Sequence, residues 1–530
     1  MLLYADDITV FLRDEKDVRS VISIIEEFSS FSALRLNLSK SEAMGIGTSK
    51  RLRFDLGVKW VKEIKVLGIY FNNLIPASEN EKNWTSKVDS IKQLIKQWEK
   101  RNLGIWGKLC IIKSLMLPQL IYTIQAICLP ETVLKEINTL IYRFLWRKKD
   151  VNKRAHEKVK RVVINAEADK GGINMIDINI MQESFLCNWF YKLLTDKNNS
   201  KWSQIPRIFL RDFGNNLTCF SSTVGPNRFK GLNKIKLFFW KKVMSTWLFY
   251  NRDAKLFSTK LTCIWNNEKI TYLKNIIFFE NWTKKITYIN EIIENDGTIK
   301  NFRDIETLLG PSPTLHFEYM IIRAAVMSYI KKTSGDMCIE RQEDKWCILE
   351  GKSTPNAKQF RIFINNFKYS EPCATRFWLN KFNVNLDDQF LTISKKVTKE
   401  SRLRELHWKI IHNIYPTNIL LFRMGIANSN KCTYCQQEID FIEHFFFECK
   451  KIRKLWTHIE SLFQTKFGKH IIIKKEDVLL GKKRDTLNTD MFSYLNHLIL
   501  IGKMCISKFR YGTPADIIIM LEKEMLLRKI

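Results

Sequence analysis

Residues 432–449 read CTYCQQEIDFIEHFFFEC, and this stretch decides the fold of the C-terminal part of the chain. Its spacing is C-x2-C-x8-H-x4-C, and it comes just after a turn-forming segment, residues 428–431 (NSNK). Three thiolates and one imidazole make a closed tetrahedral ligand set for a structural zinc ion. We therefore expect one Zn²⁺ to be bound by four residues: Cys432, Cys435, His444 and Cys449.

Two other interpretations of these cysteines explain less. A redox role for Cys432 and Cys435 would require a thioredoxin-like surrounding, which the flanking sequence lacks. Ordinary buried thiols would leave the regular spacing unexplained. The chain has 12 cysteines, and we expect the nine outside this stretch, Cys110 among them, to be reduced core residues.

The second half of the stretch predicts a helix. We expect one helix from Ile442 to Trp456 that carries both His444 and Cys449, because a separation of five residues lets both side chains bend toward one ion. Three further histidines lie near this region. With four ligands already present, we expect them to make packing or polar contacts instead: His407, His412 and His458.

A second stretch with chemical meaning is Tyr4-Ala5-Asp6-Asp7, which lies between Leu2-Leu3 and the apolar residues 8–12. The pattern predicts a strand, a tight turn and a strand, with two carboxylates at the bend. Mg²⁺ prefers oxygen ligands and usually takes one or two protein carboxylates together with phosphate and water. Asp6 and Asp7 are thus candidate catalytic Mg²⁺ ligands, and a solvated turn is the alternative.

Two further blocks follow this turn, residues 28–42 (FSSFSALRLNLSKSE) and residues 65–71 (KVLGIYF). In this order and at these intervals, the three blocks resemble the last third of the palm in reverse transcriptases of non-long-terminal-repeat (LINE-type) retrotransposons. Ala33 and Val66 depart from the family, which usually has Gly and an aromatic residue at these positions.

The resemblance implies a role for each block. Asp6 would be the direct metal ligand with Asp7 assisting, Lys40 would lie near the nucleotide phosphates, and Leu67 and Gly68 would grip the primer end. The family's palm also has a third metal-binding Asp well upstream, and fingers that close over the nucleotide. Because three residues precede Tyr4 here, we expect this chain not to polymerise DNA by itself. Two alternatives stay open: a part of an active enzyme that copies element RNA into DNA at a nicked target, and a non-functional relic.

After the palm-like blocks, apolar residues recur at helical spacing from Trp84 to Trp98, which predicts a helix. Residues 107–122 then resemble the thumb of LINE-type enzymes, with a Gly-Lys step, Ile-Lys-Ser and Leu-Pro. A thumb helix holds the template–primer duplex mostly through phosphate contacts. Lys108 and Lys113 are the candidates for such contacts, and a solvated helix face is the alternative for both.

The charge of the chain favours polyanionic partners. There are 86 Lys and Arg against 55 Asp and Glu, a net charge of +31, which predicts salt-dependent binding to nucleic acid. Basic residues interleaved with aromatics concentrate between Arg143 and Arg161, where a nuclear-localisation patch is the rival interpretation. The candidate nucleic-acid contacts here are Arg147, Lys148, Lys149, Lys153 and Arg154.

A second basic and aromatic stripe runs from Arg228 to Lys242 around Phe238, Phe239 and Trp240. It could bind nucleic acid or form an amphipathic helix with a basic outer face. Farther along, residues 401–417 and 443–456 flank the Cys/His stretch and resemble the zinc-binding tail of LINE-type elements. That resemblance implies RNA and DNA as partners.

Together these features predict an α+β, mainly helical chain. We expect a remnant of the reverse transcriptase palm over residues 1–80, a helical thumb over 81–165, a helical connector over 166–399 and a small zinc-knuckle domain over 400–530. Zinc would be structural, and Mg²⁺ would bind only to a complete palm. The uncharged stretch from Ser114 to Pro130 is too short for a membrane span and predicts a buried helix pair. We expect a nuclear and cytoplasmic protein with no membrane partner and no small-molecule substrate beyond nucleotides.

Overall fold

The computed structural model describes residues 2–4, 7–32, 34–47, 58–146, 157–196, 200–213, 217, 220, 224–254, 262–294, 298–332, 356–484, 487–510 and 514–529. These residues are mainly helical, as expected, and their strands pair in two-stranded sheets. The chain divides into two compact units, each assembled from three segments. The first unit comprises Met1–Leu94, Met116–Ile137 and Met181–Arg361, and the second comprises Ile95–Leu115, Asn138–Ile180 and Ile362–Ile530.

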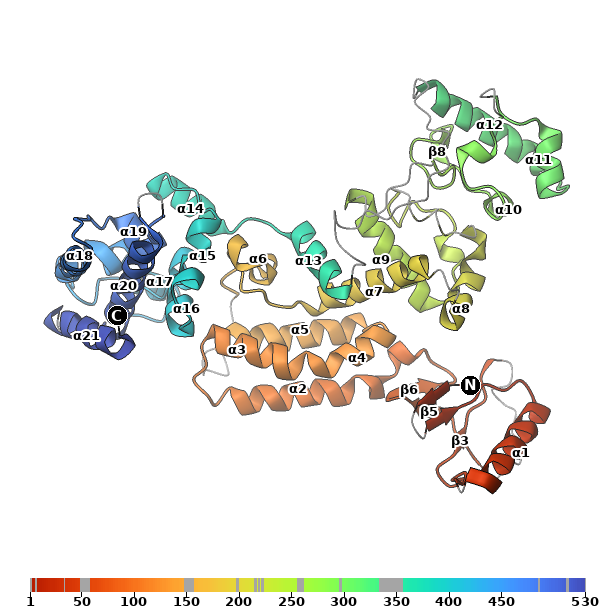
Figure 1. Ribbon diagram of the computed structural model, residues 1–530, viewed down its shortest axis with the longest axis horizontal. Coiled ribbons are helices and arrows are strands. Elements are labelled where there is room, and N and C mark those ends of the chain that lie inside the picture. Colours follow the sequence, from red (N-terminus) through yellow and green to blue (C-terminus); the bar gives the residue numbers. More distant parts are fainter. Residues whose placement is uncertain are drawn as a thin grey trace. The chain divides into compact units, whose positions relative to one another are not determined.

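The strands of the first unit are short, and most of them lie near the start of the chain (Figure 1). β1 (Leu2–Tyr4) pairs with β2 (Asp7–Thr9) in an antiparallel hairpin, which is the strand–turn–strand arrangement that the sequence predicts. β3 (Glu42–Ala43) pairs with β4 (Lys59–Trp60) in parallel.

The second hairpin joins β5 (Glu63–Val66) to β6 (Ile69–Asn72) through Leu67 and Gly68. Both loop residues have positive φ, +47° and +81°, the conformation that matches a two-residue turn to the twist of its strands. The Tyr122 hydroxyl donates a hydrogen bond of 2.6 Å to the Leu67 carbonyl. This bond stabilises Leu67 in a conformation that non-glycine residues rarely adopt.

Helices make up the rest of the first unit. Phe190, Phe220 and Trp247 are fully buried together, with ring centroids 4.6 to 5.5 Å apart, and form part of its aromatic core. The helices lying wholly in this unit are α1 (Glu15–Ser32), α4 (Pro118–Ala126), α8 (Lys201–Leu210), α9 (Phe238–Ala254), α10 (Glu280–Thr283), α11 (Phe302–Leu309) and α12 (Leu315–Lys332), with one more hairpin of β7 (Thr271–Tyr272) and β8 (Asn275–Ile276).

Four of the described helices begin in one unit and end in the other: α2 (Thr85–Trp98), α5 (Glu131–Trp146), α7 (Ile178–Thr195) and α13 (Ala357–Lys368). The bounds of α2 agree with the helix predicted between Trp84 and Trp98. Trp84, Val88 and Ile91 are buried, as the apolar spacing requires.

The second unit gathers the helices of the C-terminal third of the chain into one cluster, drawn in cyan and blue in Figure 1. Its helices are α3 (Ile105–Ile111), α6 (Arg161–Asn165), α14 (Cys373–Phe382), α15 (Asp388–Val397), α16 (Ser401–Ile411), α17 (Asn418–Arg423), α18 (Arg453–Phe467), α19 (Lys475–Leu480), α20 (Thr489–Lys508) and α21 (Pro514–Arg528).

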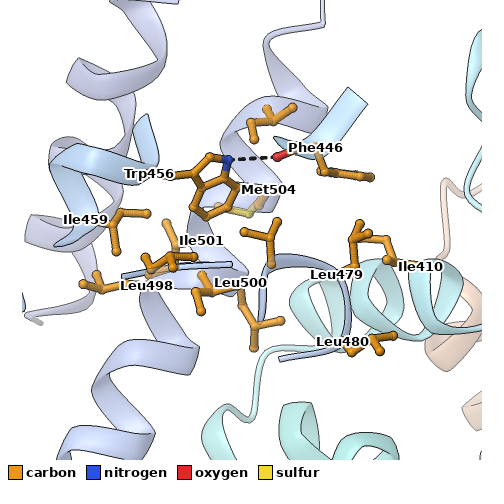
Figure 2. Close-up of a cluster of buried hydrophobic side chains, with 14 of the residues drawn as sticks. Ile410, Phe446, Trp456, Ile459, Leu479, Leu480, Leu498, Leu500, Ile501 and Met504 are labelled. Carbon is orange, nitrogen blue, oxygen red and sulfur yellow. Dashed lines mark hydrogen bonds between the residues drawn. The ribbon is translucent and has the colours of Figure 1, made fainter. Parts of the chain in front are cut away.

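α20 is the central helix of this unit. It begins at the N-cap Asn488, whose side chain accepts a hydrogen bond from the Met491 amide. Nearly every residue from Leu495 to Ile506 is buried, so neighbouring helices cover α20 on all sides. Figure 2 shows the resulting core, in which Leu498, Leu500, Ile501 and Met504 of α20 meet Ile410, Trp456, Ile459, Leu479 and Leu480 of the surrounding helices.

A pair of glycines lets a loop approach this core closely. The Gly171 carbonyl accepts hydrogen bonds from the Trp408 indole at 2.9 Å and from the His412 ring at 2.7 Å. A Cβ at Gly172 would lie 1.9 Å from the Ala166 carbonyl oxygen. The Gly-Gly pair is therefore required by the packing, since any side chain at Gly172 would displace the backbone.

No single helix among the described residues is long and apolar enough to cross a membrane. One bent helix pair, Ile105–Met116 with Pro118–Ala126, is long and apolar enough when its two parts are taken together.

A charged residue is buried between α16 and α20. Lys503 is completely buried, and its Nζ lies 2.9 Å from Nδ1 of His407, which is also buried. Burial lowers the pKa of Lys503 to about 7 and holds the pKa of His407 well below its usual value, with the nearby lysine adding to the effect. At alkaline pH both side chains are therefore neutral, and in that form their burial in the core costs least.

This burial predicts a pH dependence of stability. Because the folded pKa of Lys503 lies below the unfolded value, the unfolded state binds the additional proton between about pH 7 and about pH 10. The contribution of Lys503 to stability is therefore present at alkaline pH and lost as the pH falls through about 7. Lys503→Met should flatten the rise of the thermal unfolding midpoint between pH 7 and pH 9.5.

Lys508→Met is the matched control, since Lys508 lies on the same helix but pairs with Glu524 at the surface. It should keep the slope of the unmodified protein. Equal slopes for the unmodified protein and Lys503→Met would show that Lys503 is already charged in the folded state.

Candidate metal centre

The four predicted zinc ligands come together in the second unit. One ligand atom from each of Cys432, Cys435, His444 and Cys449 lies within 4.8 Å of all the others. Cys435 Sγ is 3.3 Å from His444 Nε2. Cys432, His444 and Cys449 are buried, and Cys435 is half-buried, so the cluster has one side near the surface.

The backbone around the first two cysteines forms a tight knuckle. Lys431 and Ile439 form an antiparallel bridge. The Cys432 amide donates to the Glu438 carbonyl at 2.8 Å, and the Gln436 amide donates to the Cys432 carbonyl at 2.9 Å. Gln436 has a φ of +56°, which reverses the chain just after Cys435. This turn brings both thiols to the same side.

The second pair of ligands is carried by a single wide turn rather than by the expected helix. A π-helical turn, η10, covers His444–Glu448 and ends at Cys449, whose amide donates to the His444 carbonyl at 3.0 Å. α18 begins separately at Arg453. The continuous helix predicted from Ile442 to Trp456 is therefore wrong. In an α-helix, residues five apart do not share a face, whereas the i→i+5 turn places His444 and Cys449 on one side.

These residues fit a zinc ion. Tetrahedral Zn²⁺ with Zn–S bonds of about 2.3 Å has ligand atoms about 3.5 to 3.8 Å apart, and the four ligand atoms here lie within 4.8 Å of one another. The neighbouring Cys449 raises the pKa of Cys432 and burial adds to this rise, whereas Cys432 lowers the pKa of Cys449. Four protein ligands leave no open position, so bound zinc would supply folding energy rather than catalysis.

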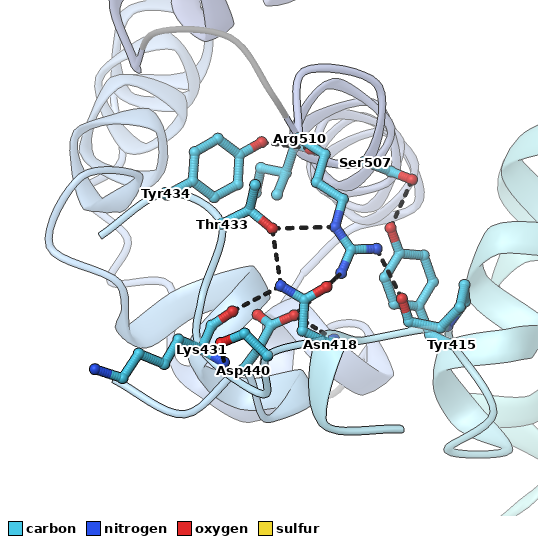
Figure 3. A network of polar contacts seen from close by, with 11 residues as sticks. Tyr415, Asn418, Lys431, Thr433, Tyr434, Asp440, Ser507 and Arg510 are labelled. Carbon is cyan, nitrogen blue, oxygen red and sulfur yellow. Dashed lines mark hydrogen bonds and ion pairs between the residues drawn. The ribbon is translucent and has the colours of Figure 1, made fainter. Parts of the chain in front are cut away.

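A polar network around Arg510 attaches the knuckle to the C-terminal end of α20 (Figure 3). The Arg510 guanidinium donates to the Pro416 carbonyl at 2.8 Å, to the Thr433 hydroxyl at 3.3 Å and to the Asn418 side chain. It also pairs with Asp440 at 3.2 Å. One side chain thus contacts both the segment before the knuckle and the knuckle itself.

Asn418 completes the network. Its amide NH₂ group donates to the Lys431 carbonyl at 2.6 Å and to the Thr433 hydroxyl at 3.1 Å, and its backbone N–H donates to Asp440. Asp440 is completely buried, and burial raises the pKa of its carboxyl while Arg510 opposes that rise. The ring of Phe445, next to the ligand His444, lies 5.1 Å from the guanidinium.

The other predicted site residues lie elsewhere. Asp7 is exposed on β2, Lys40 is exposed in a turn, and Leu67 and Gly68 form the β5–β6 turn. Lys108 is half-buried on α3 with its Nζ 5.5 Å from the centre of the Phe144 ring, and Lys113 is half-buried on a π-helical turn, η4 (Ile112–Met116). The remaining candidates lie outside the described residues: Asp6, Arg147, Lys148, Lys149, Lys153 and Arg154.

The three nearby histidines make other contacts, as expected. His407 faces Lys503, His412 bonds to Gly171, and His458 pairs with Glu522 at 3.2 Å. The expectation that the other cysteines are buried is wrong for Cys110 and Cys373, which are exposed.

The metal centre also gives the relationship of the chain to known proteins. Residues 373–456 match the family model described as zinc-binding in reverse transcriptase. The chain is thus related to reverse transcriptases. The matched segment runs from the start of α14 into α18 and includes all four ligands. Zinc binding is therefore supported by two independent findings, the match and the convergence of the ligands.

Two features of the second unit are not predicted by the motifs of the sequence. Arg510 lies far from the Cys/His stretch, and nothing in its local sequence marks it as a partner of Asp440. The second is a run of four basic residues directly after Cys449, which is visible in the sequence: Lys450, Lys451, Arg453 and Lys454.

The metal centre makes a testable prediction. The purified chain should contain one zinc per molecule, and Cys435→Ser should lose it together with local structure, because three ligands cannot close the tetrahedron. Zinc content by mass spectrometry and proteolytic sensitivity of residues 430–456 are the measurements. Cys373→Ser, at an exposed cysteine of the same segment, should keep both properties. Full zinc content in Cys435→Ser would remove this cysteine from the ligand set.

A separate prediction concerns Arg510. Arg510→Gln leaves the carboxylate of Asp440 buried without its charge partner, which should lower the free energy of unfolding by about 3 to 5 kcal/mol. Arg228→Gln is the control, since Arg228 pairs with Glu268 and both side chains are exposed to solvent. The Arg228 variant should lower the free energy of unfolding by about 1 kcal/mol or less. Unfolding of the zinc-loaded protein by denaturant measures both, and equal losses would contradict the role of Arg510.

Proposed function

We propose that this chain is a nucleic-acid-binding part of a non-long-terminal-repeat retrotransposon reverse transcriptase, and that its zinc-binding segment holds RNA or DNA. The match to the zinc-binding segment of reverse transcriptases supports the enzyme class. The net charge of +31 supports a polyanionic partner.

The observation that carries this proposal is a group of four cations beside the metal centre, which we call the post-zinc cluster: Lys450, Lys451, Arg453 and Lys454. All four are exposed. None of them forms an ion pair with an acidic residue in the described part of the chain. Arg453 lies 6.0 Å from the ring of Phe447, which leaves its charge available to solvent.

The post-zinc cluster sits where a phosphate group is favoured. It spans the turn between Cys449 and the first residues of α18 (Arg453–Phe467), so the unpaired amides at the start of that helix add to the positive potential. Ile452, within the cluster, is buried, as is Cys449. Zinc and core packing thus hold the cations in place, and less conformational entropy is lost when they bind phosphates.

The proposal predicts salt-dependent binding that depends on this cluster. Changing all four residues to Gln should weaken binding to a nonspecific single-stranded oligonucleotide and lower the slope of log affinity against log salt by about 3, since each lost phosphate contact removes about 0.7 to 0.9. Fluorescence anisotropy over a salt series gives both quantities.

The chain offers a control with the same charge change. Lys395, Lys396, Lys399 and Arg402 are also three lysines and one arginine, all exposed and all in the matched segment. Their fourfold change to Gln removes the same net charge at a different position. If this control lowers affinity and slope as much as the post-zinc variant does, binding follows total charge and the proposed site is wrong.

A further inference from the structure

We propose that the first unit carries a second nucleic-acid site, a pocket that takes one unpaired base of a single strand by stacking on Trp202. The pocket is lined by Trp189, Lys192, Thr195, Asp196 and Trp202 and has a volume of about 350 Å³. This size lies at the lower end for small-ligand pockets, roughly 300 to 1,000 Å³, which suits one base. The proposal goes beyond the zinc-binding segment, since it involves different residues in the other unit.

The wall of the pocket is preformed. The Trp189 indole N–H donates a hydrogen bond of 2.8 Å to the Gln125 carbonyl, which fixes the orientation of its ring. Trp189 also makes edge contacts with Phe239 and Trp240 of α9, with centroids 6.2 and 6.4 Å away. A ring held from several sides loses little entropy when a ligand binds.

Trp202 is the exposed member of the pair. Its ring meets Trp189 edge-on, with centroids 5.5 Å apart and planes at 67°, and 38% of Trp202 is exposed to solvent. This arrangement leaves apolar ring surface of Trp202 open at the pocket. Stacking of a base on such a ring is tolerant of sequence, because every base has a π-face.

The charges around the pocket suit the phosphates of a single strand. Lys192 and Lys201 are exposed, and neither forms an ion pair within the described part of the chain. Lys192 lies over the Trp189 ring, with its Nζ 5.4 Å from the centroid. The one acidic group in the lining, Asp196, accepts two hydrogen bonds of 2.9 Å from Ser200, from its amide and its hydroxyl. These bonds occupy the Asp196 carboxylate at the start of α8.

The stripe from Arg228 to Lys242 that the sequence marks as basic and aromatic contributes to this pocket only in part. Arg228 and Lys234 pair with Glu268 and Glu280, and Trp240 is buried. Phe239 and Trp240 support Trp189 from behind, so the stripe builds the wall of the pocket rather than the binding surface.

Photocrosslinking tests the proposal on the full chain. The probe is a short oligouridylate that carries one 5-iodouridine, because a halogenated base crosslinks to an aromatic ring on which it stacks. We expect a crosslink at Trp202 or Trp189, identified by mass spectrometry. Trp202→Ala should reduce this crosslink by at least about fivefold, in line with the loss of one stacked base, and Trp202→Phe should retain most of it.

Two controls make the result specific. Phe317→Ala, at another exposed aromatic residue of the first unit, should leave the crosslink unchanged. Double-stranded RNA should not compete for it, since paired bases are already stacked, whereas a deoxyuridine strand should compete if the site does not read the 2′-hydroxyl. Equal competition by duplex, or crosslinks confined to other segments of the chain, would overturn the proposal.

The crosslinking experiment can be told apart from the test of nucleic-acid binding at the zinc-binding segment. A crosslink at Trp202 that persists in the post-zinc variant, when that variant binds as tightly as the unmodified protein, supports the pocket and rejects the zinc-segment site. Crosslinks at residues 431–456 without one at Trp202 do the reverse.

Discussion

The second unit depends on the closure of one loop, from Cys432 to Cys449, over a hydrophobic core. In this loop some residues point at the candidate metal position and their neighbours fill the core. His444 and Cys449 point at the candidate metal position, while Phe445 and Phe446, between them, are completely buried. The Phe446 carbonyl accepts a hydrogen bond of 2.9 Å from the Trp456 indole (Figure 2). Metal coordination and core packing therefore constrain the same short segment of backbone, so the energy of binding zinc and the energy of folding this segment are one quantity.

Sequence reasoning succeeded where chemistry leaves few choices. Zinc coordination needs particular side chains at short separations, so the spacing of the three cysteines and His444 was enough to predict their convergence. The antiparallel pairing of Leu2–Tyr4 with Asp7–Thr9 could be predicted because apolar residues on both sides of a polar turn sequence mark two strands. The mainly helical class followed from apolar spacing, as for Trp84, Val88 and Ile91. The same reasoning failed for the helix after Ile442, because the requirement that His444 and Cys449 share one side overrides the α-helical period.

The remaining features arise from contacts between residues distant in the sequence, which no local pattern records. Arg510 and Asp440 form a buried pair across 70 positions. From its charge alone Lys503 would be expected at the surface of a long helix. Packing on every side of α20 instead buries it against His407. Trp189 and Trp202 belong to different helices, and their pocket exists because α7 and α8 meet. In each case the sequence supplies the residue types, and the tertiary structure decides which of them become neighbours.

The charge of a zinc-loaded centre limits how this segment could bind nucleic acid in the proposed function. Zn²⁺ with three thiolates and one neutral imidazole carries a net charge of about −1, so the centre itself repels phosphate. Any attraction must come from side chains that the centre positions, and the cations that follow Cys449 directly are the nearest in the sequence. The half-buried Arg510 cannot serve, since its donors are occupied by Asp440, Asn418, Thr433 and the Pro416 carbonyl. In the proposed function zinc would therefore act as a scaffold. It would fix the backbone that carries Lys450, Lys451, Arg453 and Lys454, whose exposed side chains are available to phosphates.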